Sequence, residues 1–351
     1  MKKLNNTELL IAKKLKENSL ESYAVIVGYN DDEWMLTSND VDLDTYFDAA
    51  SIGKVFPTTT LALKAVDEGL LSFDDTLDRF FPNVPKDKKS ITVKHLMTHT
   101  SGMYRKEFPD NVAERGRDSI ADFILGVPLE YEIGTKSAYC CTGMVLLGFI
   151  VEKVYGLSLD QAFEKLLCKP LGLTRSRYSI LPDEPNAVNC NHKVEIQDIR
   201  YDDYNVRRMN GIPAGPGGNY ITAGDLRKFV KAIIGKDERL YSKKMFELAE
   251  KNYTGGFDVC EAQRGVDNRA LGYVYVTKNS PEACDLFPDG SIGHTGWTGQ
   301  SFFINRNLNL YVILLSNATR CTAKKYGKVN YDEVCEMRAE FHRAIKKDFG
   351  L

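Results

Sequence analysis

Ser51 and Lys54 are two residues whose types and spacing could perform chemistry together. They stand three positions apart in FDAASIGKVF, residues 47–56, and this spacing of serine and lysine occurs once in the chain. Residues three apart on a helix share a face, so the ammonium can reach the hydroxyl. Partial burial and the positive end of a helix would lower the pKa of Lys54 and let the neutral amine accept or relay a proton. The pair predicts a nucleophilic serine activated by a lysine.

The same serine also has a purely structural interpretation, as the N-cap of a helix that starts near residue 51. A serine hydroxyl at an N-cap satisfies one of the unpaired N–H groups of the first turn. This interpretation leaves Lys54 unexplained, because a capping box carries Glu or Gln three residues on and a cation in the first turn opposes the helix dipole. In the catalytic interpretation, the backbone N–H of Ser51 points to where an oxyanion could form.

Two further segments could complete a site around this pair. Residues 293–305, GHTGWTGQSFFIN, place a His-Thr-Gly triplet before an apolar strand. A glycine-rich strand edge lets backbone N–H groups approach a bound carbonyl closely. Residues 137–150, SAYCCTGMVLLGFI, place Tyr139 on a loop before an apolar helix. A cation that lowered the pKa of Tyr139 would make it a general base or proton shuttle, although alone it could equally be a packed aromatic.

With these three elements the chain resembles the serine β-lactamase and penicillin-binding-protein superfamily, in its class C-like branch. The S-x-x-K motif occurs there together with a K-T-G element, whose place is taken here by His294-Thr295-Gly296. The similarity runs from about residue 44 to 318 and includes further segments in the order of the family. They are LMTHTSGM at 96–103, LLGFIVEKVYG at 146–156, KPLGLTRSRYS at 169–179 and GPGGNYITAGDLRKF at 215–229.

The resemblance implies a role for each of these residues. Ser51 is implied as the acylated nucleophile with Lys54 as its partner. Tyr139 is implied as the base that deprotonates Ser51 and later the deacylating water. The backbone N–H groups of Ser51 and Trp297 are implied as the oxyanion hole. The other implied site residues are His294, among the catalytic groups, and Cys141, Thr295 and Gly296, around the substrate.

Two departures from the family pattern bear on the substrate. The usual asparagine two residues after the tyrosine is Cys141, so its contact to the lysine and to a substrate amide is expected to be missing. The usual lysine of K-T-G is His294, as in the D-aminopeptidase-like members of the branch. Because an imidazole titrates near neutral pH, we expect kcat/KM to carry an ionisation of His294 near pH 6 to 7. Neither change touches the nucleophile. We therefore expect a serine hydrolase of small esters or amides, similar to the esterases, D-aminopeptidases and D-amino-acid amidases of the branch, with at most weak β-lactamase or penicillin-binding activity.

The elements that must position these residues suggest an α+β fold. Residues 23–36 read as two strands around an Asn-Asp-Asp turn, and residues 300–317 read as a hairpin that turns near Arg306-Asn307. A final amphipathic helix spans residues 331–349. Strands at both ends of the chain, with helices between, predict an antiparallel sheet split in sequence plus an inserted helical region. The resemblance further implies terminal helices packed on one face of the sheet.

We expect one domain over residues 1–351, with a sheet region at about 1–56 and 213–351 and a helical region at about 57–212. Within it, Ser158 and Gln161 form a capping box, and Thr222 with Asp225 opens a helix that Gly235 closes. The remaining stretches predict less regular structure. Residues 177–212 read as a long polar loop, and residues 251–290 as irregular apart from a strand at 271–276.

Composition excludes several other classes of protein. A net charge of −2 over 351 residues gives no electrostatic footprint for nucleic acid. The longest apolar run near the N-terminus, LLIA, is too short for a signal peptide, and the run at 144–154 is interrupted by Glu152, so neither export nor a membrane partner is expected. The eight cysteines include no C-x-x-C pair and are expected as reduced thiols in the cytoplasm. The oligomeric state is left open.

Neither a metal nor a cofactor is expected. His95 and His99 have helical metal-ligand spacing in HLMTH, but Leu96 stands where H-E-x-x-H has its glutamate. The sequence has no G-x-S-x-G, P-loop or Rossmann motif. The alternative to an enzyme is a catalytically silent relative that binds a ligand or partner in the same cleft, and Cys141 in place of asparagine favours that alternative most.

Overall fold

A seven-stranded antiparallel sheet forms the centre of the computed structural model, which describes residues 3–103, 112, 116–179, 184–194, 209–259, 268–283 and 285–351. The strand order is β2-β1-β11-β10-β9-β8-β7, so strands from both ends of the chain meet in the middle of the sheet. This confirms the predicted α+β fold with a sheet split in sequence. The strands are β1 (Tyr23–Tyr29), β2 (Asp32–Thr37), β7 (Asn268–Arg269), β8 (Val274–Tyr275), β9 (Ile292–Thr295), β10 (Ser301–Asn305) and β11 (Leu310–Ser316).

The strand β1 shows why the sheet has helices on both faces. In register, Val27 lies opposite Val312 of β11 on one side and Trp34 of β2 on the other. Successive side chains of a strand point to opposite faces. Val27 therefore joins one apolar cluster and Ile26 joins another, and both side chains are almost completely buried. A strand that is apolar on both faces has to be covered on both.

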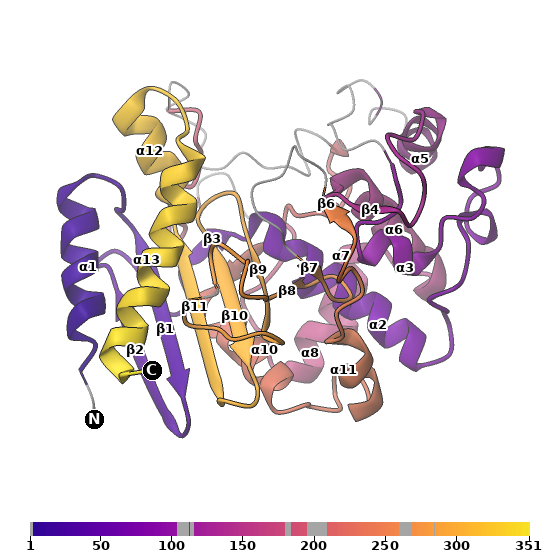
Figure 1. Ribbon diagram of the computed structural model, residues 1–351. Coiled ribbons are helices and arrows are strands. Elements are labelled where there is room, and N and C mark those ends of the chain that lie inside the picture. The colour runs from indigo at the N-terminus through magenta and orange to yellow at the C-terminus, as the bar shows by residue number, and fades with distance from the viewer. Residues whose placement is uncertain are drawn as a thin grey trace.

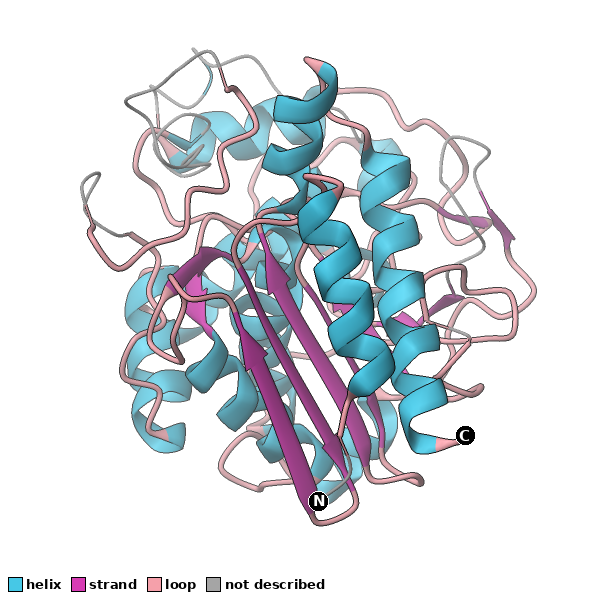
Figure 2. Ribbon diagram, turned by 90° about the vertical axis from the view of Figure 1, so that its left-hand side faces the viewer, coloured by secondary structure: helices cyan, strands magenta, loops and turns pink. Residues whose placement is uncertain are grey.

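The terminal helices α1 (Asn5–Lys16) and α13 (Tyr331–Phe349), with α12 (Ala318–Tyr326), cover one face of the sheet (Figures 1 and 2). The predicted final helix has the same bounds as α13, and its apolar stripe is buried, at Val334, Met337, Phe341 and Ile345. The resemblance implied terminal helices on this face, but the local sequence pattern did not predict α1. Its apolar pattern is weak: Ile11 is buried but Leu9 is 70% exposed.

A helical region covers the opposite face. Helix α10 (Ala223–Ile234) lies against β1, β10 and β11, and the remaining helices pack beyond it. These helices are α2 (Thr60–Asp67), α3 (Val93–Met97), α5 (Arg117–Gly126), α6 (Cys141–Tyr155), α7 (Leu159–Phe163), α8 (Lys169–Leu171) and α11 (Lys243–Ala249). Two small two-stranded sheets join this region: β3 (Tyr46–Asp48) with β5 (Tyr220–Thr222), and β4 (Lys136–Ser137) with β6 (Asp258–Val259).

Local signals in the sequence located several helix ends. Ser158 and Gln161 form the predicted capping box at α7, and the Thr222 hydroxyl accepts from Asp225 N at the start of α10. The predicted strand at 271–276 shortens to β8, while β6 and β7 lie in a stretch that we expected to be irregular. Parts of the predicted loop at 177–212 lie outside the described residues, at 180–183 and 195–208.

Within the described ranges, no helix by itself combines the length and apolar character needed to cross a membrane. Helix α6 meets that test only together with Leu159–Leu171, and the two are bent by 70° relative to one another.

Candidate active site

The segment that carries Ser51 is not the α-helix expected from the sequence. It begins as a 3₁₀ turn (Ala50–Lys54), continues as a π-helical turn (Val55–Thr59) and becomes α-helical only in α2. Pro57 lies inside the π turn. Proline has no N–H and its ring clashes with the carbonyl four residues earlier, which favours a wider turn there. Ser51 is not an N-cap either, because Ala49 occupies that position without a side-chain bond.

Ala50, directly before Ser51, has a strained backbone. Its φ of +46° lies in the left-handed region, which is costly for a residue with a Cβ. The Ala50 N–H donates to Asp48 Oδ1 at 2.8 Å, and the Asp48 carbonyl accepts from Thr298 Oγ1 at 3.0 Å and Gln300 Nε2 at 2.8 Å. These bonds tie the turn to the segment after β9. These hydrogen bonds therefore stabilise the strained backbone conformation of Ala50 next to Ser51.

Lys54 lies against Ser51, as its spacing predicted. Its Nζ donates to Ser51 Oγ at 3.0 Å and to the carbonyl of Pro216 at 2.9 Å, and the side chain is 1% exposed. Burial alone would lower the pKa of Lys54, but attraction to the Cys141 thiol and the Tyr139 phenol outweighs it and raises the pKa above its ordinary value. The expectation of a neutral, proton-accepting lysine is wrong. Lys54 is an ammonium at neutral pH.

Tyr139 also lies against Lys54, whose Nζ is 4.7 Å from the centre of the tyrosine ring. Burial raises the pKa of the phenol, while the Lys54 charge and hydrogen bonds with Lys54 and Ser51 oppose the rise only in part. Burial outweighs the lowering by the Lys54 cation, so the condition that the sequence set for Tyr139 as a base, a net lowering of its pKa, is not met in the resting state. The resting state therefore pairs a neutral phenol with an ammonium.

The His-Thr-Gly strand reaches the nucleophile from the sheet. A Cβ on Gly296 would stand 2.9 Å from the Ala49 carbonyl, so only glycine lets the end of β9 come this close to the Ser51 turn. Trp297 follows, with its ring 42% exposed. Its backbone N–H has no acceptor in the part of the chain that the structure describes. An available donor on the segment that packs against the Ser51 turn has the character required of an oxyanion hole.

His294 is placed in the site but does not titrate near neutral pH. It is 2% exposed, and its Nδ1 lies 2.7 Å from the Thr295 carbonyl, to which it donates. Burial, and then the charges of Arg269 and Lys54, lower the pKa of His294 well below its ordinary value. The sequence suggested an ionisation of His294 near pH 6 to 7 in place of a permanent lysine charge, and this is wrong. The imidazole is neutral there.

The two adjacent cysteines have different positions. Cys140 is buried, and its Sγ accepts from the Gly143 N–H at 3.3 Å as the N-cap of α6. Cys141 is half-buried, and its thiol makes a hydrogen bond with Lys54 that helps to raise the pKa of the lysine. The contact to the lysine that we expected to be lost with asparagine is therefore present, through sulfur. The described cysteines are free thiols.

Arg269 and His99 surround Tyr139, and the sequence gave neither of them a role in this site. The guanidinium of Arg269, on β7, is 5.5 Å from the tyrosine ring centre, and the His99 ring is 4.9 Å from it. Burial and the charges of Arg269 and Lys54 hold the pKa of His99 well below its ordinary value. His99 Nδ1 accepts from Cys140 N at 3.2 Å. Its spacing from His95 was noted only as that of metal ligands, and nothing local marked Arg269.

The histidines of HLMTH do not face a common ligand. His95 Nδ1 accepts from the Thr92 N–H at 3.1 Å and closes a capping box at α3, away from the contacts of His99. Across the described ranges, no three side chains of His, Cys, Asp or Glu are grouped so that they could hold a metal ion.

Comparisons with known proteins bear on the family and the fold of the chain. The family model described as Beta-lactamase matches residues 8–330. The chain is 27% identical over 311 residues to the "Putative D-alanyl-D-alanine carboxypeptidase" of Escherichia coli (strain K12), covering 78% of this chain and 69% of that protein. It is 25% identical over 308 residues to the "N-acetylmuramyl-L-alanine amidase" of Bacillus subtilis (strain 168), covering 78% and 68%. The solved structure of "EstCE1, a hydrolase with promiscuous acyltransferase activity" shares the fold, with a TM-score of 0.74 at 16% identity over 97% of each chain.

Proposed function

The chain is a serine hydrolase of the beta-lactamase family, and from this premise we propose that it cleaves small esters and amides through an acyl-enzyme on Ser51. One observation carries the assignment of the nucleophile: the fully buried Lys54 ammonium donates to Ser51 Oγ at 3.0 Å, and Tyr139 is hydrogen-bonded to both residues. A nucleophile and its proton acceptor have to lie within hydrogen-bond reach, and these three side chains do.

Tyr139 is the base in this proposal, and Lys54 keeps its proton throughout. In the minor phenolate form, which the Lys54 charge stabilises, Tyr139 takes the Ser51 proton as Oγ bonds to the substrate carbonyl carbon. The negative carbonyl oxygen is then stabilised by the N–H groups of Ser51 and Trp297. Collapse breaks the bond to the leaving group, which takes the proton from Tyr139. A water molecule repeats the sequence, giving its proton to Tyr139, and releases the acid and Ser51.

The proposed substrate preference depends on Cys141. An amide at this position donates to a substrate carbonyl and accepts from the lysine, and a thiol does both weakly. Activated esters bear that loss better than amides, because their leaving group needs less assistance than an amine. We therefore propose that short-chain activated esters react fastest, D-amino-acid amides more slowly and β-lactams very weakly. The names of the two relatives, a carboxypeptidase and an amidase, support amides as the physiological class.

A reducing location is part of the same proposal. The described cysteines are free, and a thiol at position 141 would contact the lysine only while it stays reduced. We propose the cytoplasm as the compartment in which the protein acts.

Covalent labelling tests the proposed function directly. Intact-protein mass spectrometry after exposure to a fluorophosphonate should show one added label, located at Ser51 by peptide mapping. Ser51→Ala should take no label and lose turnover of p-nitrophenyl acetate. Ser242→Ala, which removes a helix-capping hydroxyl at α11, is the matched control and should behave as the wild type.

The alternative of a catalytically silent relative predicts the opposite result. In that case the wild-type protein takes no label, and Ser51→Ala changes neither labelling nor the background rate of ester hydrolysis. A label on another serine would also overturn the assignment of Ser51.

A further inference from the structure

Arg338, in the middle of α13, is the largest side chain of the described residues that is completely buried. Its Nη1 pairs with Glu282 Oε2 at 2.7 Å, and its Nη2 donates to the carbonyl oxygen of Gly296. Burying a charge is costly, and one carboxylate with excellent geometry only offsets that cost. The second contact, to the end of the His-Thr-Gly strand, is the one that reaches the candidate active site.

The Gly296 carbonyl and the Trp297 N–H belong to one peptide unit. The described chain contains no cis peptide bonds, so in this trans unit the C=O and the N–H point in opposite directions. The carbonyl accepts from Arg338 and from the Gly299 N–H at 3.2 Å. The N–H on the other side has no acceptor in the described part of the chain. This N–H is the second oxyanion donor of the proposed mechanism.

We propose that Arg338 is a positioning residue for the oxyanion hole: its guanidinium holds and polarises the Gly296–Trp297 peptide so that the Trp297 N–H is aimed and strengthened as a donor. This inference rests on the proposed function. A charged donor makes a hydrogen bond about twice as strong as a neutral one. Hydrogen bonds in a chain polarise one another, which strengthens each by roughly 10–30%. Donors that are fixed before the reaction cost nothing to orient during it.

The side chain of Trp297 is held from the same direction. Its ring stacks on Tyr331 with centres 4.5 Å apart and planes 15° from parallel. Arg338 braces Tyr331 in turn, with Nη1 3.4 Å from the phenol oxygen and the guanidinium carbon 5.6 Å from the ring centre. Arg338 thus restrains both the peptide and, through Tyr331, the ring of one residue.

The test compares Arg338→Met with Arg343→Met. Arg343 lies on the same helix and pairs with Asp285 at 3.0 Å. Asp285 is three residues after Glu282, the partner of Arg338, but among the described residues Arg343 makes no hydrogen bond to Gly296. For p-nitrophenyl acetate, we expect Arg338→Met to lower kcat about tenfold to a hundredfold, below the 10²–10³-fold cost of deleting a donor, with KM within twofold. Arg343→Met should leave both unchanged.

A boronic acid inhibitor separates this role from a general loss of structure. Ser51 Oγ adds to boron, and an oxygen of the tetrahedral boronate occupies the oxyanion hole. The inhibition constant of butylboronic acid in Arg338→Met should rise by the same factor as kcat/KM falls, because both report the tetrahedral state. Unchanged kcat/KM and inhibition constant in a folded Arg338→Met, or equal losses in Arg343→Met, would overturn the inference.

Arg338→Lys decides the question if the methionine variant does not fold. A lysine keeps the charge, but its single ammonium cannot pair with Glu282 and the Gly296 carbonyl in the fork geometry of a guanidinium. We expect kcat/KM and boronate affinity to fall together, about threefold to tenfold, which corresponds to one weakened hydrogen bond. If Arg338→Lys keeps the kcat/KM and the boronate affinity of the wild type, the inference is contradicted. The proposed function fails separately, through the absence of fluorophosphonate labelling in the wild type.

Discussion

Two buried lysines, Lys54 and Lys14, show how differently this protein uses the same side chain. Lys54 is 1% exposed and Lys14 is 6% exposed. Lys14, on α1, pairs with Glu340 of α13 and lies 3.7 Å from Glu17. Lys54 donates to a serine hydroxyl and a carbonyl, and none of the described carboxylates pairs with it. A buried cation with only neutral partners is expensive, so its place has to be explained by chemistry.

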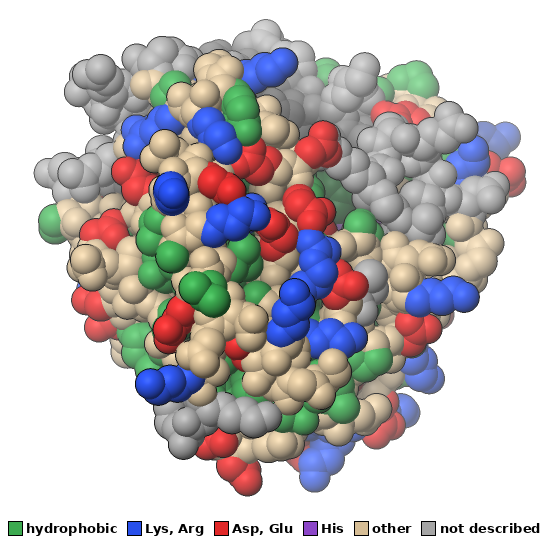
Figure 3. All heavy atoms as spheres, turned by 60° about the vertical axis from the view of Figure 1, so that its left-hand side comes forward, with side chains coloured by type: hydrophobic (Ala, Val, Ile, Leu, Met, Phe, Trp, Pro, Cys, Tyr) green, Lys and Arg blue, Asp and Glu red, His purple; other side chains and the backbone are tan. Residues whose placement is uncertain are grey.

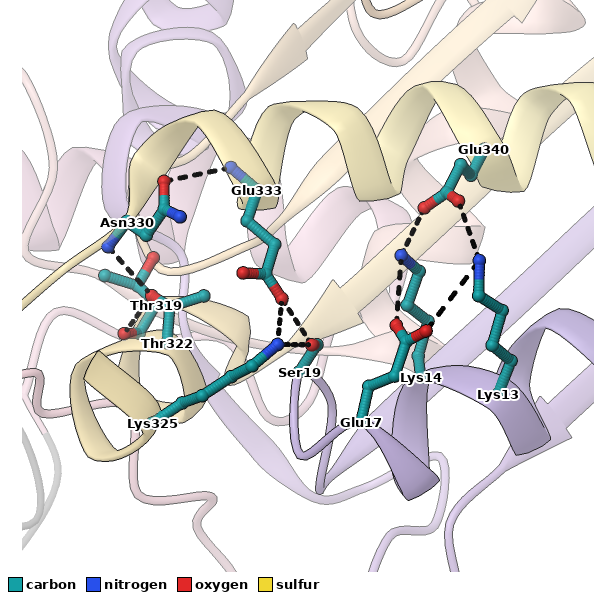
Figure 4. Close-up of polar contacts among 10 residues, drawn as sticks. All are labelled: Lys13, Lys14, Glu17, Ser19, Thr319, Thr322, Lys325, Asn330, Glu333 and Glu340. Atoms are coloured by element: carbon teal, nitrogen blue, oxygen red, sulfur yellow. Dashed lines mark hydrogen bonds and ion pairs between the residues drawn. The ribbon is translucent and has the colours of Figure 1, made fainter.

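Lys14 belongs to a network that joins the terminal helices, shown in Figure 4. Glu340 also forms an ion pair with Lys13, and nearer the start of α13 Glu333 pairs with Lys325 of α12 at 2.9 Å. Figure 3 shows cationic and anionic side chains interspersed over the described part of this face. Such pairs near water are individually weak and are screened by salt. The ion pairs connect α1 and α12 to α13, and the loss of one side chain leaves the other pairs intact.

The sharpest test of this comparison replaces each lysine by methionine. Lys54→Met should lower kcat for p-nitrophenyl acetate about 10⁴-fold, the upper end of the range for general-base catalysis, because the Tyr139 phenolate loses the charge that stabilises it. Its Tm should stay unchanged or rise, because a buried charge is removed. Lys14→Met should keep kcat and lower the free energy of unfolding by about 1–2 kcal/mol. Urea unfolding and steady-state kinetics of both variants provide the measurements. Equal kinetic losses would remove the distinction between the two sites.

Tyr139→Phe examines the neighbour of Lys54. The variant loses only the phenolic oxygen, so the fold should persist, and turnover should fall about 10²–10⁴-fold, the usual range for a general base. Circular dichroism and kcat for an activated ester provide the comparison with the wild type. A rate near that of the wild type would show that Tyr139 only packs against the lysine.

The pH dependence of kcat/KM tests which group of the candidate site is the base. The pKa values of Lys54 and Tyr139 both lie above their ordinary values, so at pH 7 little of the pair has lost its proton. Below those pKa values, each increase of one pH unit raises the deprotonated fraction about tenfold, so log kcat/KM should rise with a slope near one between pH 7 and 9. His294 is neutral in this range, and His294→Gln should keep the slope. A plateau from pH 7 to 9 would exclude this base.

Cys141→Asn should change the balance between ester and amide substrates. One restored hydrogen bond is worth roughly 0.5–1.5 kcal/mol, or about tenfold in rate. We expect amide or β-lactam turnover to rise about tenfold relative to ester turnover, while Cys140→Ala, which affects a helix cap, should leave the ratio unchanged. The proposal on substrate preference does not survive an unchanged ratio, or a wild type that hydrolyses β-lactams faster than esters.

The smallest effect is expected for the network of the terminal helices. Glu340→Gln removes the carboxylate shared by Lys13 and Lys14 and should lower the free energy of unfolding by about 1 kcal/mol, less at 1 M salt, where the wild-type pairs are screened. Urea titrations at low and high salt measure this change in the free energy of unfolding, and the kcat of Glu340→Gln should equal that of the wild type. A lower kcat in Glu340→Gln would show that the network of the terminal helices affects the candidate active site.

The residues of the candidate site were largely predictable from local patterns. The spacing of Ser51 and Lys54, the tyrosine before an apolar helix and the His-Thr-Gly strand each depend on neighbours along the chain. The same holds for the β1–β2 and β10–β11 hairpins and for α13, because hydrophobic periodicity and turn chemistry act over a few residues. The division into a sheet region and a helical region within one domain stays a prediction.

The sequence by itself indicated the main groups around the serine, Lys54, Tyr139 and His294, and the segments that form the β1–β2 and β10–β11 hairpins. Only the tertiary structure decided their charges, because a pKa depends on burial and on neighbours that are distant in sequence. Lys54 is an ammonium since Cys141 and Tyr139 outweigh its burial, while His294 is neutral since burial and Arg269 act together. Arg338 lies 42 residues after Gly296, and no local pattern could have brought its guanidinium to that carbonyl. The packing of α13 on the sheet placed it there.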